Sequence, residues 1–277
     1  MQNLIIENKF LIDKNKKQIK KIWLNNFLDD DENTVDLFLE NVFENEKGVG
    51  AFLNNELIAM ILFLNSKIIF KNRKINSIYF YAVCTEQNYR NQGVMRSLFA
   101  FAKEMAKEQG AEVCFLVPEN ESLFKMYEKF SFERNINFTK ECVFRSGSDI
   151  KNTMSRITDF CYKEYLSLRI QESEKNPVVV LNENEFNFIF DKTREDVSFL
   201  FLKTGYAVFE KVGIKITVSE ICGNRNDVLS WLFNFYSDVN EIEIFKYSEK
   251  EKSDFGMTFS LNETDNFNNI YFGMPYR

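Results

Sequence analysis

Residues 79–132 read YFYAVCTEQNYRNQGVMRSLFAFAKEMAKEQGAEVCFLVPENESLFKMYEKFSF, and this stretch decides the expected fold. It starts within a nearly continuous apolar run at 78–84, which is typical of a strand buried on both faces. A polar loop follows, and residues 94–109 then carry apolar side chains at helical spacing. Residues 113–117 form a second short apolar run that ends at Pro118. The pattern therefore predicts the order strand, loop, helix, strand.

The preceding segments extend this alternation of helices and strands. Apolar side chains at helical spacing predict a helix over 15–28 and another that begins near Thr34. Residues 49–64, VGAFLNNELIAMILFL, predict two strands around a tight Asn54-Asn55 turn, because asparagine tolerates a positive φ. The elements expected after residue 118 in this half are a helix at 121–130 and a strand at 132–144.

A length of 277 residues suits two domains, and Arg145-Ser146-Gly147-Ser148 is the best candidate linker. We assign 1–146 to an α/β (α+β) domain with a mixed, twisted sheet flanked by helices. We assign 147–277 to a second, smaller α+β domain. The elements expected in it are helices at 150–171, 183–195 and 227–236, and strands at 178–181, 206–210, 214–221 and 241–245.

The second half partly echoes the first. Residues 222–235, CGNRNDVLSWLFNF, repeat the order found in residues 84–101, CTEQNYRNQGVMRSLFAF: a strand that ends in cysteine, a polar loop, and a helix with aliphatic and aromatic positions. The later loop is shorter and lacks the Arg-x-x-Gly of residues 90–93. We interpret it as a degenerate repeat without the ligand loop, and two unrelated sheet domains remain the alternative.

The composition narrows the class of function. The net charge is −6 and no block of Lys and Arg stands out, which argues against nucleic acid or an anionic membrane as partner. The N-terminus lacks the basic start and apolar run of a signal peptide, and no window approaches the roughly 20 apolar residues of a transmembrane helix. Five widely spaced cysteines are expected to be reduced core residues, so we expect a cytoplasmic protein.

The chain contains no histidine. This excludes Ser-His and Cys-His nucleophile systems and most transition-metal sites, so we expect no metal cofactor. Proton transfer must then use carboxylates, tyrosine, lysine, water or a chain terminus.

The loop that follows the first buried strand has the features of an anion site. A glycine, Gly93, stands where the next helix begins, and a helix N-terminus offers free N–H groups and partial positive charge. Gly93 would let the backbone approach an oxyanion closely, and Arg90 and Arg96 could neutralise a pyrophosphate. The dinucleotide and P-loop motifs are both absent, and a plain structural turn remains the alternative.

Residues 90–95 resemble the acetyl-CoA loop of the GCN5-related N-acetyltransferase (GNAT) superfamily, whose pattern is Arg/Gln-x-x-Gly-x-Gly/Ala. Met95 stands in place of the final small residue, and this departure resembles the "enhanced intracellular survival"-like subgroup. Residues 120–132, NESLFKMYEKFSF, resemble the superfamily's Asn-x-x-Ala-x-x-x-Tyr-x-x-x-Gly-Phe helix, with Leu123 for Ala and Ser131 for Gly. The two imperfect motifs occur in the expected order.

This resemblance implies an N-acyltransferase with acetyl-CoA as donor and co-substrate. Backbone groups of Val83 and Thr85 would hold the pantetheine arm. Tyr127 would be the general acid that reprotonates the CoA thiolate, although a core aromatic is the alternative. The residues that would hold the pyrophosphate or contact the cofactor are Arg90, Asn91, Gln92, Gly93, Val94, Met95, Arg96 and Asn120, the last of which could equally be a helix N-cap.

The general base is open at this stage, because the strand 78–84 contains no Asp or Glu. Glu119 and Glu121 lie near Tyr127 in sequence, and a water could relay the proton. The subgroup resemblance implies a further candidate, the C-terminal carboxylate of Arg277.

The resemblance covers 1–145 well and the remainder weakly, and implies for the latter a degenerate GNAT-like domain that contributes to the acceptor site. The acceptor would be a primary amine on a small molecule or a peptide, attacked directly in a ternary complex. The alternatives are a catalytically silent acyl-CoA-binding or protein-interaction module, and transfer to a protein lysine or N-terminus. Neither nucleic acid nor membrane is expected as a partner, and homo-oligomerisation is left open.

Overall fold

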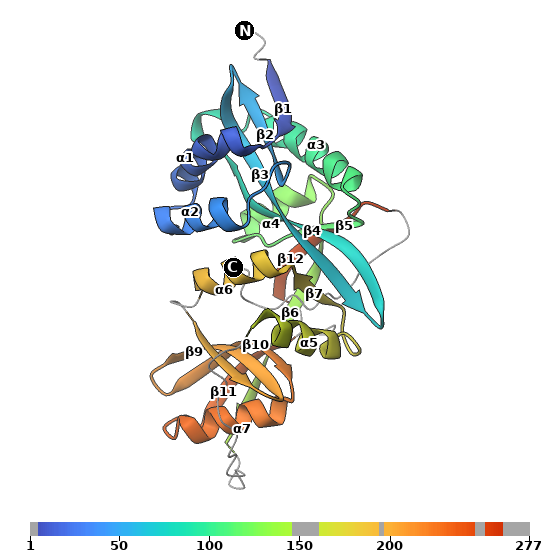
Figure 1. Cartoon of the computed structure of the whole chain (residues 1–277). Coiled ribbons are helices and arrows are strands. Elements are labelled where there is room, and N and C mark those ends of the chain that lie inside the picture. Colours follow the sequence, from blue (N-terminus) through green and yellow to red (C-terminus); the bar gives the residue numbers. More distant parts are fainter. Residues whose placement is uncertain (1–4, 146–160, 194–196, 247–252, 263–277) are drawn as a thin grey trace. The chain divides into compact units, whose positions relative to one another are not determined.

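The computed structural model describes residues 5–145, 161–193, 197–246 and 253–262. Contacts between Cα atoms divide the chain into two units (Figure 1). Among the described residues, the first unit comprises 5–67, 75–133 and 257–262. The second comprises 68–74 and the described part of 134–256. The first unit thus includes a C-terminal segment, 257–262, and the second unit includes an N-terminal segment, 68–74.

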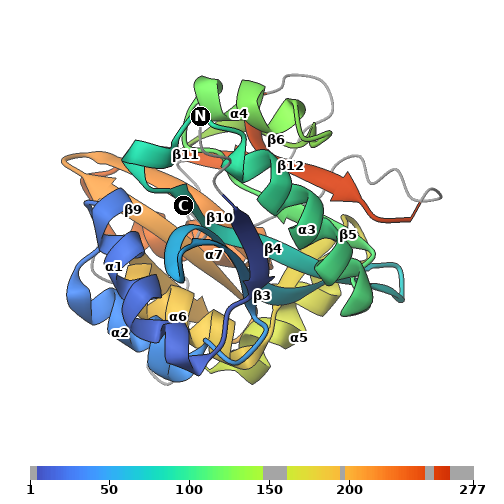
Figure 2. The same ribbon diagram turned by 90° about the horizontal axis from the view of Figure 1, so that it is seen from above.

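The first unit is built on one sheet with the strand order β1-β2-β3-β4-β5-β12. Strands β4 and β5 run parallel, whereas the pairs β1–β2, β2–β3 and β5–β12 are antiparallel. Helices α1 and α2 lie on one side of the sheet and α3 lies on the other, as Figures 1 and 2 show. The strands are β1 (Ile6–Phe10), β2 (Gly48–Leu53), β3 (Glu56–Phe70), β4 (Arg73–Thr85), β5 (Val113–Leu116) and β12 (Ser253–Ser260), and the helices are α1 (Lys16–Asn26), α2 (Glu32–Asn41), α3 (Val94–Glu108) and α4 (Glu121–Glu128).

A tight turn joins β2 to β3. Asn54 and Asn55 have φ angles of 51° and 66°, and Leu53 pairs with Glu56 beside them. Two successive left-handed residues match the twist of the flanking strands, and asparagine adopts this conformation at little cost. The hairpin expected around Asn54-Asn55 is confirmed.

Strand β4 carries the packing of the first unit on both of its faces. Trp23 of α1 lies 5.6 Å from Tyr81 of β4 and 5.0 Å from Phe38 of α2, measured between ring centroids. On the opposite face Phe99 of α3 lies 6.0 Å from Phe80. Successive side chains of a strand point to opposite faces, and burying an aromatic ring of this size contributes about 1.5–3 kcal/mol. Helices α1 and α3 are therefore both fixed against the strand that leads into the candidate site.

A lysine on α3 lies against the strand from the far end of the chain. The Nζ of Lys103 lies 3.3 Å from the ring centroid of Phe259 on β12 and 4.9 Å from that of Phe132. It also donates a hydrogen bond to the backbone oxygen of Phe130. Cation–π contacts of this kind contribute about 0.5–2 kcal/mol, so they help to hold β12 in the first sheet.

The second unit has a sheet with the strand order β6-β11-β10-β9-β8. Strands β10 and β11 run parallel, and the pairs β6–β11, β9–β10 and β8–β9 are antiparallel. One cluster of buried apolar side chains gathers under α7 and a second under α5 and α6. The elements are β6 (Glu133–Phe144), α5 (Tyr162–Glu172), β7 (Val178–Leu181), α6 (Glu183–Thr193), β8 (Ser198–Leu202), β9 (Gly205–Val212), β10 (Lys215–Gly223), α7 (Arg225–Phe235) and β11 (Glu241–Lys246).

A buried ion pair braces the second unit. The Arg169 guanidinium donates to Glu220 at 3.0 Å, and both side chains are almost fully buried. Arg169 also donates to the backbone oxygen of Val179 at 2.6 Å, and Tyr206 donates its hydroxyl to Glu220 at 2.5 Å. Removing one partner of such a network leaves a buried charge uncompensated, which is strongly destabilising. The network joins α5, β7, β9 and β10.

The expected elements are found where the structure describes them, with three additions. Residues 150–160 of the helix expected at 150–171 lie outside the described residues. Strands β1, β8 and β12 were not expected from the sequence, and β4 begins earlier than the apolar run at 78–84. Three of the five cysteines are buried as expected, whereas Cys142 and Cys161 are exposed. No helix in the described ranges is both long and apolar enough to cross a bilayer.

The expected linker is only partly described. Arg145 does not behave as linker, because its guanidinium donates to the backbone oxygens of Phe233, Tyr236 and Val239 at 2.6–3.0 Å. Ser146, Gly147 and Ser148 lie outside the described residues. The division of the chain at 146 and 147 stays a prediction.

Candidate functional site

Strand β4 is irregular where the first sheet opens. Ala82 has a φ of 46°, a left-handed conformation that residues with a Cβ seldom adopt. Pairing between β4 and β5 ends at Tyr79 and Phe115, although β4 continues to Thr85. Within the described residues the last six residues of β4 have no register with β5. Backbone groups on that edge, including those of Val83, can therefore pair with an extended ligand.

The N-terminus of α3 follows this open edge. Gly93 is its N-cap residue, with φ 80° and ψ −1°, and no side chain caps the helix. The first N–H groups of a helix have no intrahelical acceptor, and they carry partial positive charge. A Cβ placed on Gly93 would meet no heavy atom within 4 Å. The amides that begin α3, at Val94, Met95 and Arg96, thus border open space that suits an anion.

The two arginines of the loop differ in their surroundings. Arg90 donates from Nε to the backbone oxygen of Thr85 at 3.0 Å and from Nη2 to Asn26 Oδ1 at 2.7 Å. Arg96 is exposed and makes no ion pair in the part of the chain that the structure describes. Arg96 is therefore the freer of the two to neutralise a phosphate, while Arg90 ties the loop to β4 and α1.

The remaining loop residues shape the backbone. Asn91 is exposed with a φ of 61°, and Gln92 donates from Nε2 to the backbone oxygen of Asn88 at 2.7 Å. Val94 is buried and Met95 is half-buried, so these side chains anchor the first turn of α3. The cofactor contacts that the resemblance implies for these residues stay a prediction.

Tyr127 lies in the same unit, on α4. Its side chain is buried, and its ring meets those of Phe99 and Phe132 edge-on at 5.7 and 6.2 Å. Burial raises the pKa of its hydroxyl well above the usual value, and the nearby Cys84 adds to this shift. The phenol is therefore protonated at neutral pH and can donate a proton but cannot act as a base.

Cys84 lies near Tyr127, and burial affects its pKa in the same direction. Burial raises the pKa of the Cys84 thiol well above its usual value. Cys84 is therefore no nucleophile, because the thiolate is the reactive form.

The other proposed catalytic groups receive less support from the geometry. Asn120 is the N-cap of α4, and its Oδ1 accepts from the N–H of Leu123 at 3.2 Å. Glu119 and Glu121 are exposed, and Lys125 lies 3.9 Å from Glu121. Arg277 lies outside the described residues, so its proposed role stays a prediction.

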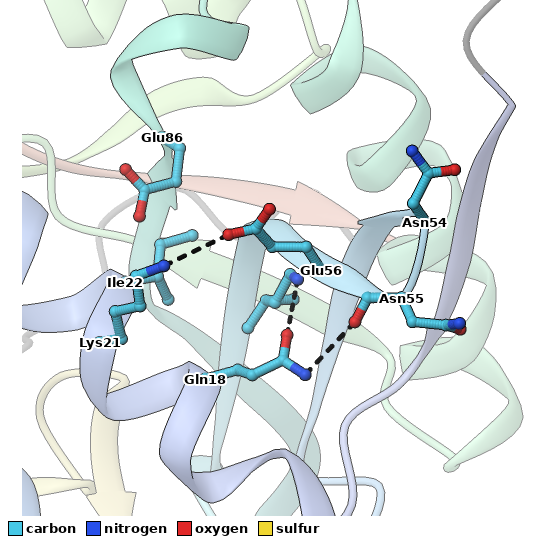
Figure 3. A pocket seen from close by; sticks show the side chains of 8 residues that line it. Gln18, Lys21, Ile22, Asn54, Asn55, Glu56 and Glu86 are labelled. Atoms are coloured by element: carbon cyan, nitrogen blue, oxygen red, sulfur yellow. Dashed lines mark hydrogen bonds and ion pairs between the residues drawn. The ribbon is translucent and has the colours of Figure 1, made fainter.

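A cavity of about 250 Å³ lies between α1 and the turn that joins β2 to β3 (Figure 3). Its polar groups are largely engaged with one another. Gln18 accepts from the N–H of Leu57 at 2.7 Å and donates to the backbone oxygen of Asn55, and Lys21 pairs with Glu56 at 3.2 Å. Glu86, the first residue after β4, completes one wall, so this cavity adjoins the loop without containing the N-terminus of α3.

Sequence reasoning missed several residues that shape the site. Ala82 carries no sequence signal, because alanine has no preference for a positive φ. Asn25 and Asn26 hold the loop from α1, more than 60 positions away in the chain. Their role depends on contacts that no local pattern contains.

Comparison with known proteins gives one family match, and it lies in the first half of the chain. Residues 9–134 match the family model described as an acetyltransferase (GNAT) domain. A search of curated proteins finds no match.

Solved structures resemble the chain at low sequence identity. A GCN5-related N-acetyltransferase from Kribbella flavida superposes with a TM-score of 0.70 at 14% identity, over 92% of this chain and 70% of that one. Eis1 from Mycobacterium abscessus gives 0.72 at 10% identity, over 92% and 74%. A probable N-acyltransferase from Enterococcus faecalis gives 0.73 at 10% identity, over 93% and 73%. These likenesses show a shared fold, and they confirm the expected mixed α/β sheet flanked by helices.

Proposed function

Because residues 9–134 match the family model of an acetyltransferase (GNAT) domain, we propose that this chain transfers an acetyl or similar short acyl group from acetyl-CoA to a primary amine. The observation that carries the proposal is the uncapped N-terminus of α3 beside the unpaired edge of β4. The first can bind a pyrophosphate and the second can bind an extended pantetheine arm. Acetyl-CoA supplies the activated thioester.

The loop residues bind and orient the donor in this proposal. N–H groups from Asn91 to Arg96 would hold the pyrophosphate, with Arg96 adding positive charge. Backbone groups of Val83 and Thr85 would pair with the pantetheine amides along β4. The splayed edge beyond Tyr79 leaves room for that pairing. Asn120 already serves as a helix cap, and a cofactor contact would use its remaining amide donors.

Tyr127 would supply the proton in the chemical step. The neutral amine nitrogen attacks the thioester carbonyl, the C–N bond forms and the C–S bond breaks. A base or water takes the surplus proton of the former amine nitrogen, the thiolate accepts the Tyr127 proton, and the Tyr127 phenolate regains a proton from that base or from solvent before the next turnover. A raised phenol pKa alone would oppose this transfer. The proposal therefore requires that the pKa of the bound CoA thiol also be raised, which brings the proton affinities of donor and acceptor closer together.

Calorimetry with acetyl-CoA and a CoA-release assay over a panel of amines test this proposal. We expect saturable binding, and we expect Tyr127→Phe to lower kcat about a hundredfold while the acetyl-CoA Kd stays within about twofold of wild type. Tyr162→Phe is the matched control, because its hydroxyl donates only to the backbone oxygen of Leu181 in the second unit. Absence of acetyl-CoA binding by the wild-type chain would refute the proposal.

A catalytically silent acyl-CoA-binding module is the second candidate. Met95 in place of a small residue, and a β4 segment 78–84 without Asp or Glu, favour it. Two results would support this candidate: acetyl-CoA binds but no amine causes CoA release, and Tyr127→Phe changes neither result. Release that depends on Tyr127 would eliminate it.

The acceptor and the compartment are further parts of the proposal. We place the acceptor among small-molecule or peptide primary amines, with a contribution from residues 147–277, and the protein in the cytoplasm. The base is a carboxylate, a water relay or the Arg277 carboxylate. An amide product identified by mass spectrometry would name the acceptor.

A further inference from the structure

The C-terminal end of α1 holds the beginning of the loop that joins β4 to α3. Asn26 Oδ1 accepts from Arg90 Nη2 at 2.7 Å, and Asn25 Nδ2 donates to Glu86 Oε1 at 3.0 Å. The same Arg90 side chain donates from Nε to the backbone oxygen of Thr85 at 3.0 Å. Both ends of the segment 85–90 are thus tied to one turn of one helix.

The Asn26 amide is itself oriented for this contact. Its Nδ2 donates to the backbone oxygen of Ile22, one turn earlier in α1, at 2.8 Å. Only its oxygen then remains to accept from Arg90, and a guanidinium can only donate. The pair is therefore complementary and directional.

A third element fixes the same segment. The N–H of Glu86 donates to the backbone oxygen of Ile58 on β3 at 2.9 Å. With α1, β3 and β4 all bonded to residues 85–90, only two positions, Asn91 and Gln92, remain before Gly93. The position of the α3 amides relative to β4 is thereby set before any ligand arrives.

We propose that Asn26 is a positioning residue for the donor site, which acts through Arg90 to hold the β4–α3 loop in its binding conformation. The inference rests on the proposed acetyl-CoA site. A loop held in its bound conformation loses less conformational entropy when a ligand binds, so its affinity is higher. Arg90 serves the site by bracing the loop, whereas Arg96 supplies charge directly.

The test compares Asn26→Leu with Asn41→Leu in the full chain. Asn41 on α2 makes the same kind of helix contact, from Nδ2 to the backbone oxygen of Leu37 at 3.0 Å, and no contact with the loop. We expect Asn26→Leu to weaken acetyl-CoA binding about tenfold in calorimetry and to raise its KM by a similar factor, with kcat within about twofold. Asn41→Leu should bind like wild type, and Asn26→Asp should retain most of the affinity because a carboxylate also accepts from Arg90.

A double variant separates bracing from direct phosphate binding. If Arg90 acts through Asn26, then Arg90→Met combined with Asn26→Leu should bind no more weakly than Arg90→Met alone. Additive losses would show that Asn26 does not act through Arg90 and would overturn the proposal. Unchanged or tighter binding by Asn26→Leu would overturn it as well.

Amide hydrogen exchange without ligand tests the brace independently of function. We expect the amides of residues 86–93 to exchange about tenfold faster in Asn26→Leu than in wild type or Asn41→Leu. Equal exchange would overturn the inference even if acetyl-CoA binds. Faster exchange in a chain that does not bind acetyl-CoA would instead refute the proposed function and leave the brace standing.

Discussion

Two strand–loop–helix segments, β4–α3 in the first unit and β10–α7 in the second, occupy equivalent places in their sheets. Each strand pairs in parallel with the strand after the helix, and that strand pairs antiparallel with one that is far from it in the sequence: β5 with β12, and β11 with β6. The echo between residues 84–101 and 222–235 therefore corresponds to a shared strand order. The topology alone does not distinguish a ligand site from a plain connection.

The helix N-termini differ. Asn224 caps α7, and its Oδ1 accepts from the N–H groups of Asn226 and Asp227 at 3.1 and 3.3 Å. The N–H of Asn224 donates to the backbone oxygen of Thr204 at 2.7 Å, so the turn before β9 lies against this connection. At α3 no side chain caps the helix, and the space beside Gly93 is open. Two units of one topology thus differ in whether the protein satisfies its own helix amides, and only α3 leaves them for an anion.

The largest expected effect is a loss of stability at Gly223, where the β10–α7 connection packs against the turn before β9. A Cβ on Gly223 would lie 2.4 Å from the backbone oxygen of Thr204 and 2.7 Å from the Cα of Gly205, and its φ is 84°. We expect Gly223→Ala to lower the free energy of unfolding by about 3 kcal/mol, as strain and overpacking combine. Urea unfolding measures this. Gly213→Ala, with φ 58° and no heavy atom within 4 Å, should cost only about 1 kcal/mol. Equal losses would contradict the close packing at Gly223.

The next largest effect is expected at Gly93, in the β4–α3 connection, where the space beside the glycine is open. We expect Gly93→Ala to cost about 1 kcal/mol of stability and to weaken acetyl-CoA binding at least tenfold, because the added methyl group enters the anion space. Gly110→Ala, near the other end of α3, is the control, since Gly110 has φ 81° and nothing within 4 Å. It should lose the same stability and keep wild-type affinity in calorimetry. If Gly93→Ala and Gly110→Ala bound acetyl-CoA with equal affinity, the proposed difference between the α3 and α7 N-termini would be contradicted.

The smallest effect concerns the lysine that holds β12 in the first sheet. Burial lowers the pKa of Lys103 to about 8 from 10.5. Between about pH 8 and pH 10.5, Lys103 binds more protons in the unfolded chain than in the folded one. The contribution of Lys103 to the free energy of unfolding therefore rises with pH over this range. We expect the stability difference, wild type minus Lys103→Met, to increase over this range in urea titrations. The increase should be small because the side chain is only half-buried. A flat or falling difference would contradict the burial of the charge.

The sequence predicted the elements whose signal is local. The Asn54-Asn55 turn, helix α3 and strand β5 follow from residue preferences and from periodicity within short windows. The polar loop and the Gly93 position followed for the same reason. Strand β12 could not be predicted, because its residues become a strand by pairing with β5 from far along the chain.

The site was predictable to the same extent. Gly93 and Tyr127 stand out by their motif positions. The structure shows an open helix end at the first and a buried phenol at the second, and burial raises the pKa of that phenol. Arg90 was expected to face the phosphates, but its partner Asn26 is 64 positions away and no pattern connects the two. The left-handed conformation of Ala82 could not be predicted from the sequence, because it is imposed by the sheet and not by the side chain.

The placement of β12 has a consequence for synthesis of the chain. On the ribosome, β5 emerges long before Met257–Ser260, the residues that pair with its second edge. During that interval an apolar strand with unpaired backbone groups is exposed to other nascent chains, and such edges favour aggregation. Translation that stops between residues 116 and 257 would release a protein with this edge permanently open. The sheet of the first unit is therefore completed late, after the strands of the second sheet have been made.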